Sequence, residues 1–168
     1  MKHVSRRGLL KTVGAGALVP LVPTVVVAQT TAPTLVTNLR ATHRADSTPK
    51  FDRVVIDLSG AVPAEVKWEY VPKLIADGSG FEVPIEGSVK YQITLRGVQA
   101  HTDAGGSTLP QRTITPRLPI VRQVKLFSDF EGIVLVGIGL SRETRTRTLL
   151  INDRARNTVR AVIDFIIL

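Results

Sequence analysis

The sequence predicts an all-β fold, a sandwich or a barrel of about eight short strands, preceded by a cleavable signal peptide. Three observations support this prediction. After residue 50, apolar residues recur with a period of two, the spacing at which successive side chains of a strand point to opposite faces. Turn-forming residues separate these runs at short intervals. The chain opens with a basic segment that is followed by an apolar one.

The first 28 residues are typical of a twin-arginine signal peptide. Arg6 and Arg7 come just before an uncharged run, residues 12–27, which two prolines interrupt. Such a run suits a signal peptide better than a membrane span. Small residues near its end predict cleavage after Ala28, so that the exported chain begins at Gln29 and has no stable membrane span. The alternative interpretation is an uncleaved helix that anchors the chain.

The remaining chain divides into a linker with a first strand, residues 29–50, and a folded domain, residues 51–168. Residues 100–119 hold three prolines and a Gly-Gly pair, and are predicted to form a loop that crosses between sheets. Residues 71–77 could form one short turn of helix. The predicted strands are Leu35–Arg40, Val54–Leu58, Glu65–Tyr70, Val89–Arg96, Ile120–Phe127, Ile133–Leu140, Thr146–Ile151 and Val159–Ile167.

Composition limits the possible partners. The chain has 168 residues, enough for one globular domain, and no cysteine, which excludes disulfides and thiolate metal sites. Four basic residues of the leader account for half of the net charge of +8, leaving +4. This charge is compatible with an anionic partner but too small and too scattered for a nucleic-acid binder. Trp68 and Tyr70 occupy core-facing strand positions, so they do not form a stacking platform for bases.

No catalytic constellation is evident. Beyond the leader only His43 and His101 remain, without the spacing of a zinc hydrolase. A two-histidine site completed by Asp103 is conceivable, and so is a Ser-His-Asp arrangement of His101, Asp103 and a serine. The alternative is structural, with Asp103 orienting a loop around His101. We therefore expect a protein that is not an enzyme and has neither a metal site nor a cofactor.

Asp129 and Glu131 could form the carboxylate pair of a glycosidase. Their position between two strong strands favours a structural turn, in which Asp129 bonds to the backbone and Phe130 packs back into the core. Gly137 and Gly139 resemble half of a dinucleotide fingerprint, but no third glycine follows. Glycine inside a strand usually marks close approach of another backbone, which we expect between the two sheets.

The last quarter of the chain is rich in arginine, and two interpretations are open. The first is a charged strand edge that prevents edge-to-edge pairing. The second is a surface that attracts phosphates or carboxylates of wall polymers. The arginines concerned are Arg142, Arg145, Arg147, Arg154, Arg156 and Arg160.

Four segments carry a resemblance to a known family. They are Phe51–Leu58, Ala100–Asp103, Asp129–Gly132 and Gly137–Leu140, in that order along the chain. Together they resemble the AMIN-like domain of secreted actinobacterial proteins, which is related to the AMIN domain of cell-wall amidases. The likeness extends from about Leu39 to Ile166, and the turn at residues 152–154 departs from the family pattern. It implies a β-sandwich that binds or localises at the cell wall without catalysis.

These observations lead to two functional hypotheses. The first is a secreted, non-catalytic domain that binds peptidoglycan or anionic wall polymers at the cell envelope. The second is an interaction module that docks on another exported protein through a sheet edge. Salt separates them, since electrostatic binding weakens at high ionic strength. The candidate binding residues are Arg53, His101, Asp103, Asp129 and Glu131.

Overall fold

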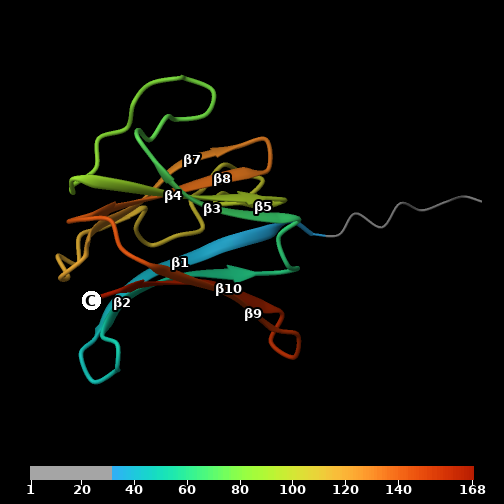
Figure 1. Ribbon diagram of the computed structural model, residues 1–168. Helices are drawn as coiled ribbons and strands as arrows, with labels where there is room; N and C mark the ends of the chain where they lie inside the picture. The colour runs from blue at the N-terminus through green and yellow to red at the C-terminus, as the bar shows by residue number, and fades with distance from the viewer. Residues whose placement is uncertain (1–31) are drawn as a thin grey trace, which may run out of the picture. The chain divides into compact units, whose positions relative to one another are not determined.

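The computed structural model describes residues 32–168, which form ten strands in two five-stranded sheets (Figure 1). Arg6, Arg7 and Ala28, on which the export prediction rests, lie outside the described residues. Residues 32–168 contain no helix with the length and apolar character needed to cross a membrane. The strands are β1 (Thr34–Arg44), β2 (Phe51–Ser59), β3 (Glu65–Val71), β4 (Val89–Arg96), β5 (Val98–Gln99), β6 (Thr113–Ile114), β7 (Val121–Phe130), β8 (Ile133–Leu140), β9 (Thr146–Asp153) and β10 (Thr158–Ile166).

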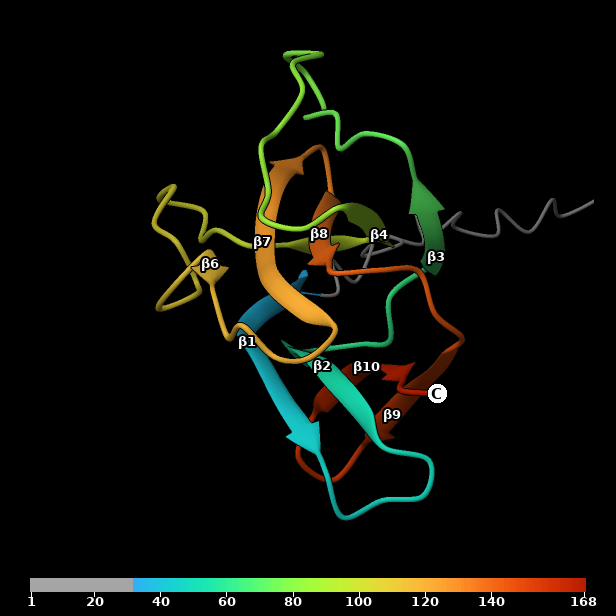
Figure 2. The same cartoon turned by 60° about the vertical axis from the view of Figure 1, so that its left-hand side comes forward.

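The two sheets lie over one another as layers (Figures 1 and 2). We call the sheet with the order β5-β1-β2-β10-β9 sheet A, and the sheet with the order β3-β4-β8-β7-β6 sheet B. Neighbouring strands are antiparallel except β1 and β5, which pair in parallel over two residues. The chain passes between the sheets after β2, β4, β5 and β8, so the sandwich is held together by contacts distant in sequence.

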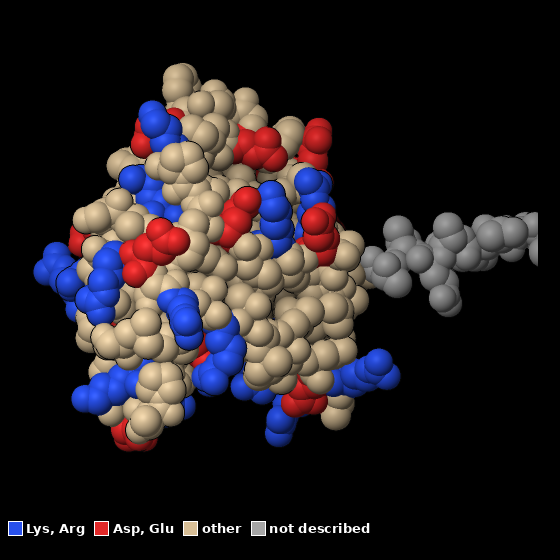
Figure 3. Space-filling view, viewed as in Figure 1, with Lys and Arg blue, Asp and Glu red and all other residues tan. Residues whose placement is uncertain are grey.

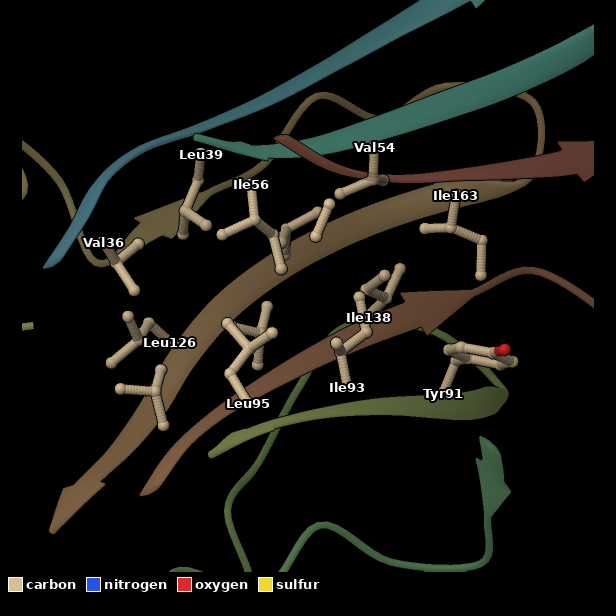
Figure 4. Close-up of a cluster of buried hydrophobic side chains, with 14 of the residues drawn as sticks. Val36, Leu39, Val54, Ile56, Tyr91, Ile93, Leu95, Leu126, Ile138 and Ile163 are labelled. Carbon is tan, nitrogen blue, oxygen red and sulfur yellow. The ribbon is translucent and has the colours of Figure 1, made fainter. Parts of the chain in front are cut away.

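The hydrophobic core lies between the sheets and takes one side of each strand (Figure 4). Val54 and Ile56 of β2 and Ile163 of β10 point inward from sheet A, and Ile93 and Leu95 of β4 face them from sheet B; all five are fully buried. Burying one such side chain contributes roughly 1.5–3 kcal/mol relative to leaving it in water. The alternation of the sequence therefore corresponds to the two faces of each sheet.

The all-β prediction is confirmed, and each of the eight predicted strands is present. Strand β8 has the predicted bounds, Ile133–Leu140. Strand β1 continues past the predicted end at Arg40 to Arg44, because its polar second half pairs with β2 in regular register. Residues 34–44 are thus part of sheet A, and the folded part of the chain begins well before Phe51.

Two predictions about the connections are corrected. The predicted loop at residues 100–119 contains β6, which pairs with β7, and His101 forms an isolated bridge with Ser107. The short helical turn predicted at residues 71–77 does not form, because Ile75 bridges Glu82 in an extended conformation. The two strands beyond the predicted eight are β5 and β6, each only two residues long.

The outer face of sheet B is covered by the connection between β3 and β4, residues 72–88, which rises above the sheet in Figures 1 and 2. A Cβ atom on Gly137 would collide with the buried Leu74, and one on Gly139 would collide with the carbonyl group of Glu86. The glycines of β8 therefore permit close packing, as predicted. The backbone that approaches them belongs to this connection, and not to the opposite sheet as expected.

Candidate functional site

The structure brings together two of the five predicted site residues, Asp129 and His101. Nδ1 of His101 lies 2.7 Å from Oδ2 of Asp129. The same carboxylate accepts hydrogen bonds from the backbone N–H of Ala100 at 3.1 Å and from Nη2 of Arg112 at 3.1 Å. Its side chain is only 4% exposed. Asp129 therefore joins the end of β7 to the segment that follows β5, a structural connection between the two sheets.

The other two loop residues lie apart from this pair. Asp103 is exposed in the turn closed by the hydrogen bond from Thr102 N–H to the carbonyl of Gly106, and the partner of His101 is Asp129 rather than Asp103. Glu131 is exposed at the turn between β7 and β8. Asp129 belongs to β7 and not to this turn. Phe130 is 50% exposed, which corrects the prediction that its ring packs into the core.

Arg53 occupies a different surface, the outer face of sheet A. Its guanidinium donates Nε–H to Oδ1 of Asp164 at 2.6 Å and Nη2–H to Oδ2 at 2.9 Å. Arg147 of β9 donates to the same carboxylate at 2.6 and 3.0 Å. Both guanidiniums lie over the ring of Phe51, at 5.1 and 5.4 Å from its centroid. The cluster joins β2, β10 and β9 across the sheet.

Burial alone would raise the pKa of Asp164, whose side chain is 2% exposed. The hydrogen bonds from Arg53 and Arg147, and the charges of these two guanidiniums, outweigh burial and lower the pKa of Asp164 below its ordinary value of 3.8. Asp164 therefore remains a carboxylate and neutralises part of the charge of the two arginines.

Asp52 is a functional group that sequence reasoning missed. It points into the core between the sheets and is fully buried. Its Oδ2 accepts hydrogen bonds from the backbone N–H groups of Ile120 at 2.6 Å and Val121 at 2.9 Å, and its Oδ1 lies 2.7 Å from Nδ1 of His43. The sequence contains a signal for this burial, because Asp52 lies on the same side of β2 as the inward-facing Val54 and Ile56.

The strongest candidate for a binding surface is the outer face of sheet A. Strand pairing places the outward side chains of three strands in rows: Arg40 beside Val55, Thr42 beside Arg53, and Asp57 beside Arg160. A groove of about 200 Å³ lies over the middle of this face. Its lining residues are Arg40, Thr42, Arg44, Arg53, Val55, Ile151, Arg160 and Val162, and we call it the arginine groove.

A second hollow of about 380 Å³ continues the arginine groove toward the turn between β9 and β10, since Arg40 and Arg160 line both. It adds the carboxylates of Asp57 and Asp153 and the guanidinium of Arg156. In Figure 3 the contour of the lower part of the molecule, formed by sheet A, is hollowed between the two hairpin loops, and blue side chains lie around it. The surface is therefore elongated and concave.

The charges of the groove differ in how they are neutralised. Arg40 forms a two-point ion pair with Asp57, with both N···O distances at 2.7 Å, and Arg53 is held by Asp164. Among residues 32–168, no carboxylate lies within ion-pair distance of Arg44 or Arg160. These two guanidiniums remain available for a ligand, and each can bind a carboxylate or phosphate through two parallel hydrogen bonds.

The chemistry of the arginine groove is that of binding. Its lining offers guanidinium groups, one hydroxyl and aliphatic side chains, and none of the lining residues carries a carboxylate or an imidazole. In the described part of the chain, no group of three or more histidine or acidic residues is arranged to hold a metal ion.

Only part of this surface was foreseen. The sequence identifies Arg53 and Arg160 as candidate binding residues. It does not identify Arg40 and Arg44, because β1 joins the groove only through its pairing with β2. Of the arginines of the last quarter, Arg160 lines the groove, whereas Arg147 and Arg156 are engaged with Asp164 and Asp153. Arg147 lies on the edge strand β9 and Arg160 lies on β10, whereas the other four arginines lie in the segments before and after β9.

Comparison with known proteins gives one match. No curated protein and no solved structure matches the sequence. The family model for the AMIN-like domain matches residues 34–166, which extend from the start of β1 to the end of β10. The family indicates a cell-wall-related, non-catalytic domain that works outside the cytoplasm. The match covers most of the chain and both sheets, and the chain belongs to the AMIN-like domain family.

Proposed function

We propose that the chain is an exported, non-catalytic domain that attaches to the cell envelope by binding anionic polymers of the wall in the arginine groove. The carrying observation is the pair of unneutralised guanidiniums, Arg44 and Arg160, beside Arg40 and Arg53 on one concave face. Peptidoglycan carboxylates and the phosphates of other wall polymers share the chemistry that such a face recognises. The family membership supports the same cellular setting.

The groove suits a repeating ligand better than a small one. The arginine groove and the second hollow share Arg40 and Arg160, and together they extend across β1, β2 and β10. An exposed ion pair contributes only about 0.2–1 kcal/mol, so one contact gives weak binding. A polymer offers many anionic groups, and several weak contacts on one chain combine into stable attachment. The aliphatic floor of Val55, Val162 and Ile151 adds contact with the uncharged part of the ligand.

The residues proposed to bind the polymer differ in part from those expected from the sequence. Arg53 remains in the set as part of the groove wall. His101 and Asp129 are engaged with one another, and Asp103 and Glu131 lie in separate exposed turns, so we assign these four no direct contact.

Export through the twin-arginine pathway forms part of the proposal, with Arg6 and Arg7 as the recognition pair and cleavage after Ala28. The exported chain would then begin at Gln29, shortly before β1. N-terminal sequencing of the protein recovered from outside the cytoplasm tests this. Replacement of both arginines by lysine should retain the full-length chain inside the cell. Export of that variant at the normal rate would contradict the assignment.

Binding is tested by co-sedimentation of the purified protein with isolated cell walls at low and high salt. The double variant Arg44→Glu/Arg160→Glu removes the two free guanidiniums and adds repulsion, so binding at low salt should weaken roughly tenfold or more. Arg122→Glu/Arg142→Glu is the matched control, because it reverses the same number of charges at two arginines that line neither hollow and have no ion pair within residues 32–168. Equal binding by the double variant and the control would refute the groove as the site.

The alternative, docking on another exported protein through a sheet edge, has one supporting observation, the exposed edge strand β9 with Leu149 and Leu150. Backbone pairing and apolar contact depend little on ionic strength. Retention on walls that persists at high salt and disappears after the wall proteins are removed would favour this alternative.

A further inference from the structure

Strand β9 differs from the other three sheet edges of the described domain. Natural sheets protect their edges by short strands, charges, prolines or bulges. Strands β5 and β6 are two residues long, and the parts of β1 and β7 that they leave uncovered contain bulges and charged residues. Strand β3 presents Glu65, Lys67 and Glu69 in alternation. Strand β9 is eight residues long, pairs with β10 without a bulge, and has an uncharged centre, Thr148–Ile151. Its two charged residues, Arg147 and Asp153, lie toward its ends, so the centre of this edge has no evident protection.

The centre of β9 also exposes apolar side chains on both faces. Leu149 is 53% exposed and Leu150 is 37% exposed. Leu149 is opposite Val162 of β10 and belongs to the outer face, whereas Leu150 is opposite Ala161 and points toward the inner side. There a hollow of about 360 Å³ separates β9 from β3, with Val66 and Trp68 on its far wall. An open edge strand with exposed leucines is a template for pairing with another chain.

The sequence of β9 is complementary to itself. When two copies run antiparallel with Leu150 opposite Leu150, Leu149 faces Ile151 and Arg147 faces Asp153, on the same side of both strands. The two-fold axis repeats each contact, so the charge pair and the apolar pair each form twice. A register shifted by one residue would bring outward side chains opposite inward ones and lose these pairs.

We propose that a second copy of this chain is the partner of the β9 edge, and that the two copies join their A sheets into one continuous sheet centred on Leu150. Arg147 and Asp153 already have partners within the chain, Asp164 and Arg156, but the side chain of Arg147 is 62% exposed and can contact a second carboxylate. The exposed leucines become buried at the junction.

This inference goes beyond the binding of wall polymers and has a consequence for it. The two-fold axis of an antiparallel strand pair is perpendicular to the sheet, so the outer faces of both copies lie on the same side. Two arginine grooves then form one surface. A polymer that spans both is held more firmly than by either groove alone.

The first test is the mass of the purified protein in solution, measured by analytical ultracentrifugation over a range of concentrations. The chain should have twice the mass of one copy. Leu150→Lys places two ammonium groups opposite each other at the axis and should halve this mass. Phe81→Lys is the matched control, because Phe81 is 77% exposed in the connection between β3 and β4 and should leave the dimer intact. Circular dichroism establishes that both variants are folded.

The second test fixes the register. The chain has no cysteine, so one introduced thiol can cross-link only to its counterpart in another copy. Directly opposite residues of an antiparallel pair have Cα atoms about 4.5–5.5 Å apart, within the range of a disulfide. Leu150→Cys should therefore form a covalent dimer under mild oxidation, whereas Phe81→Cys should not. A monomeric chain at the highest soluble concentration, or equal cross-linking by the two variants, would overturn the proposal.

Discussion

The buried carboxylate of Asp52 gives a strong prediction about stability. Replacement by alanine removes the acceptor for the N–H groups of Ile120 and Val121 and leaves both without their partner in the core. A buried donor without a partner costs about 1–3 kcal/mol, so two such donors predict a loss of about 2–6 kcal/mol. Domains of this size are stable by about 5–15 kcal/mol, and a loss of this magnitude would be large.

Urea unfolding followed by the fluorescence of Trp68, the single tryptophan, measures this loss. Asp52→Asn should lose less than Asp52→Ala, because an amide oxygen can still accept both hydrogen bonds. Asp103→Ala, which removes an exposed carboxylate, is the control and should change stability by less than about 0.5 kcal/mol. An alanine variant at Asp52 as stable as this control would refute the role of Asp52 as a connection between the sheets.

Two further predictions concern acid stability and the packing of β8. Because arginine contacts lower the pKa of Asp164 in the folded chain, ionisation of this group stabilises the fold above about pH 4, and that contribution is lost as the pH falls through the lowered value. The Asp164→Asn variant should therefore be less stable near neutral pH, and its stability should depend less on pH in acid. Thermal unfolding between pH 2 and pH 7, roughly the range over which carboxylates titrate, measures this. The same dependence of stability on pH in the variant as in the original chain would contradict the prediction. Gly139→Ala should lower the free energy of unfolding by about 1–3 kcal/mol, since its methyl group would collide with the carbonyl of Glu86. Gly106→Ala is the control, because its methyl group would make only an ordinary contact. Equal unfolding midpoints for the two variants would contradict the close packing at Gly139.

The sequence predicted the fold well where local pattern decides it. Strand β8 is an uninterrupted apolar run between two turn signals, and its bounds were predicted without error. The second half of β1 was missed, because its polar residues have no local strand signal and become a strand only by pairing with β2. Tertiary pairing overrides local propensity at such a position.

The candidate site was harder to predict, because it depends on register between distant segments. Arg40 and Arg44 are more than 100 positions from Arg160, and only the neighbourhood of β1, β2 and β10 brings them onto one face. The sequence favours Asp103, two residues away, as the partner of His101, but its partner in the structure is Asp129, which lies on β7. Asp52 belongs to the family segment Phe51–Leu58, and its position on the inward-facing side of β2 marks it as a buried acid that needs partners.

A chemical-shift map of the folded domain, titrated with a soluble anionic fragment of the cell wall, tests the central claim most directly. If the arginine groove binds the polymer, the largest shifts should fall on the outer face of sheet A, at Arg44, Val55, Arg160 and Val162, and should fade as salt is added. Shifts confined to sheet B and residues 72–88, or no shift at all at low salt, would contradict the account.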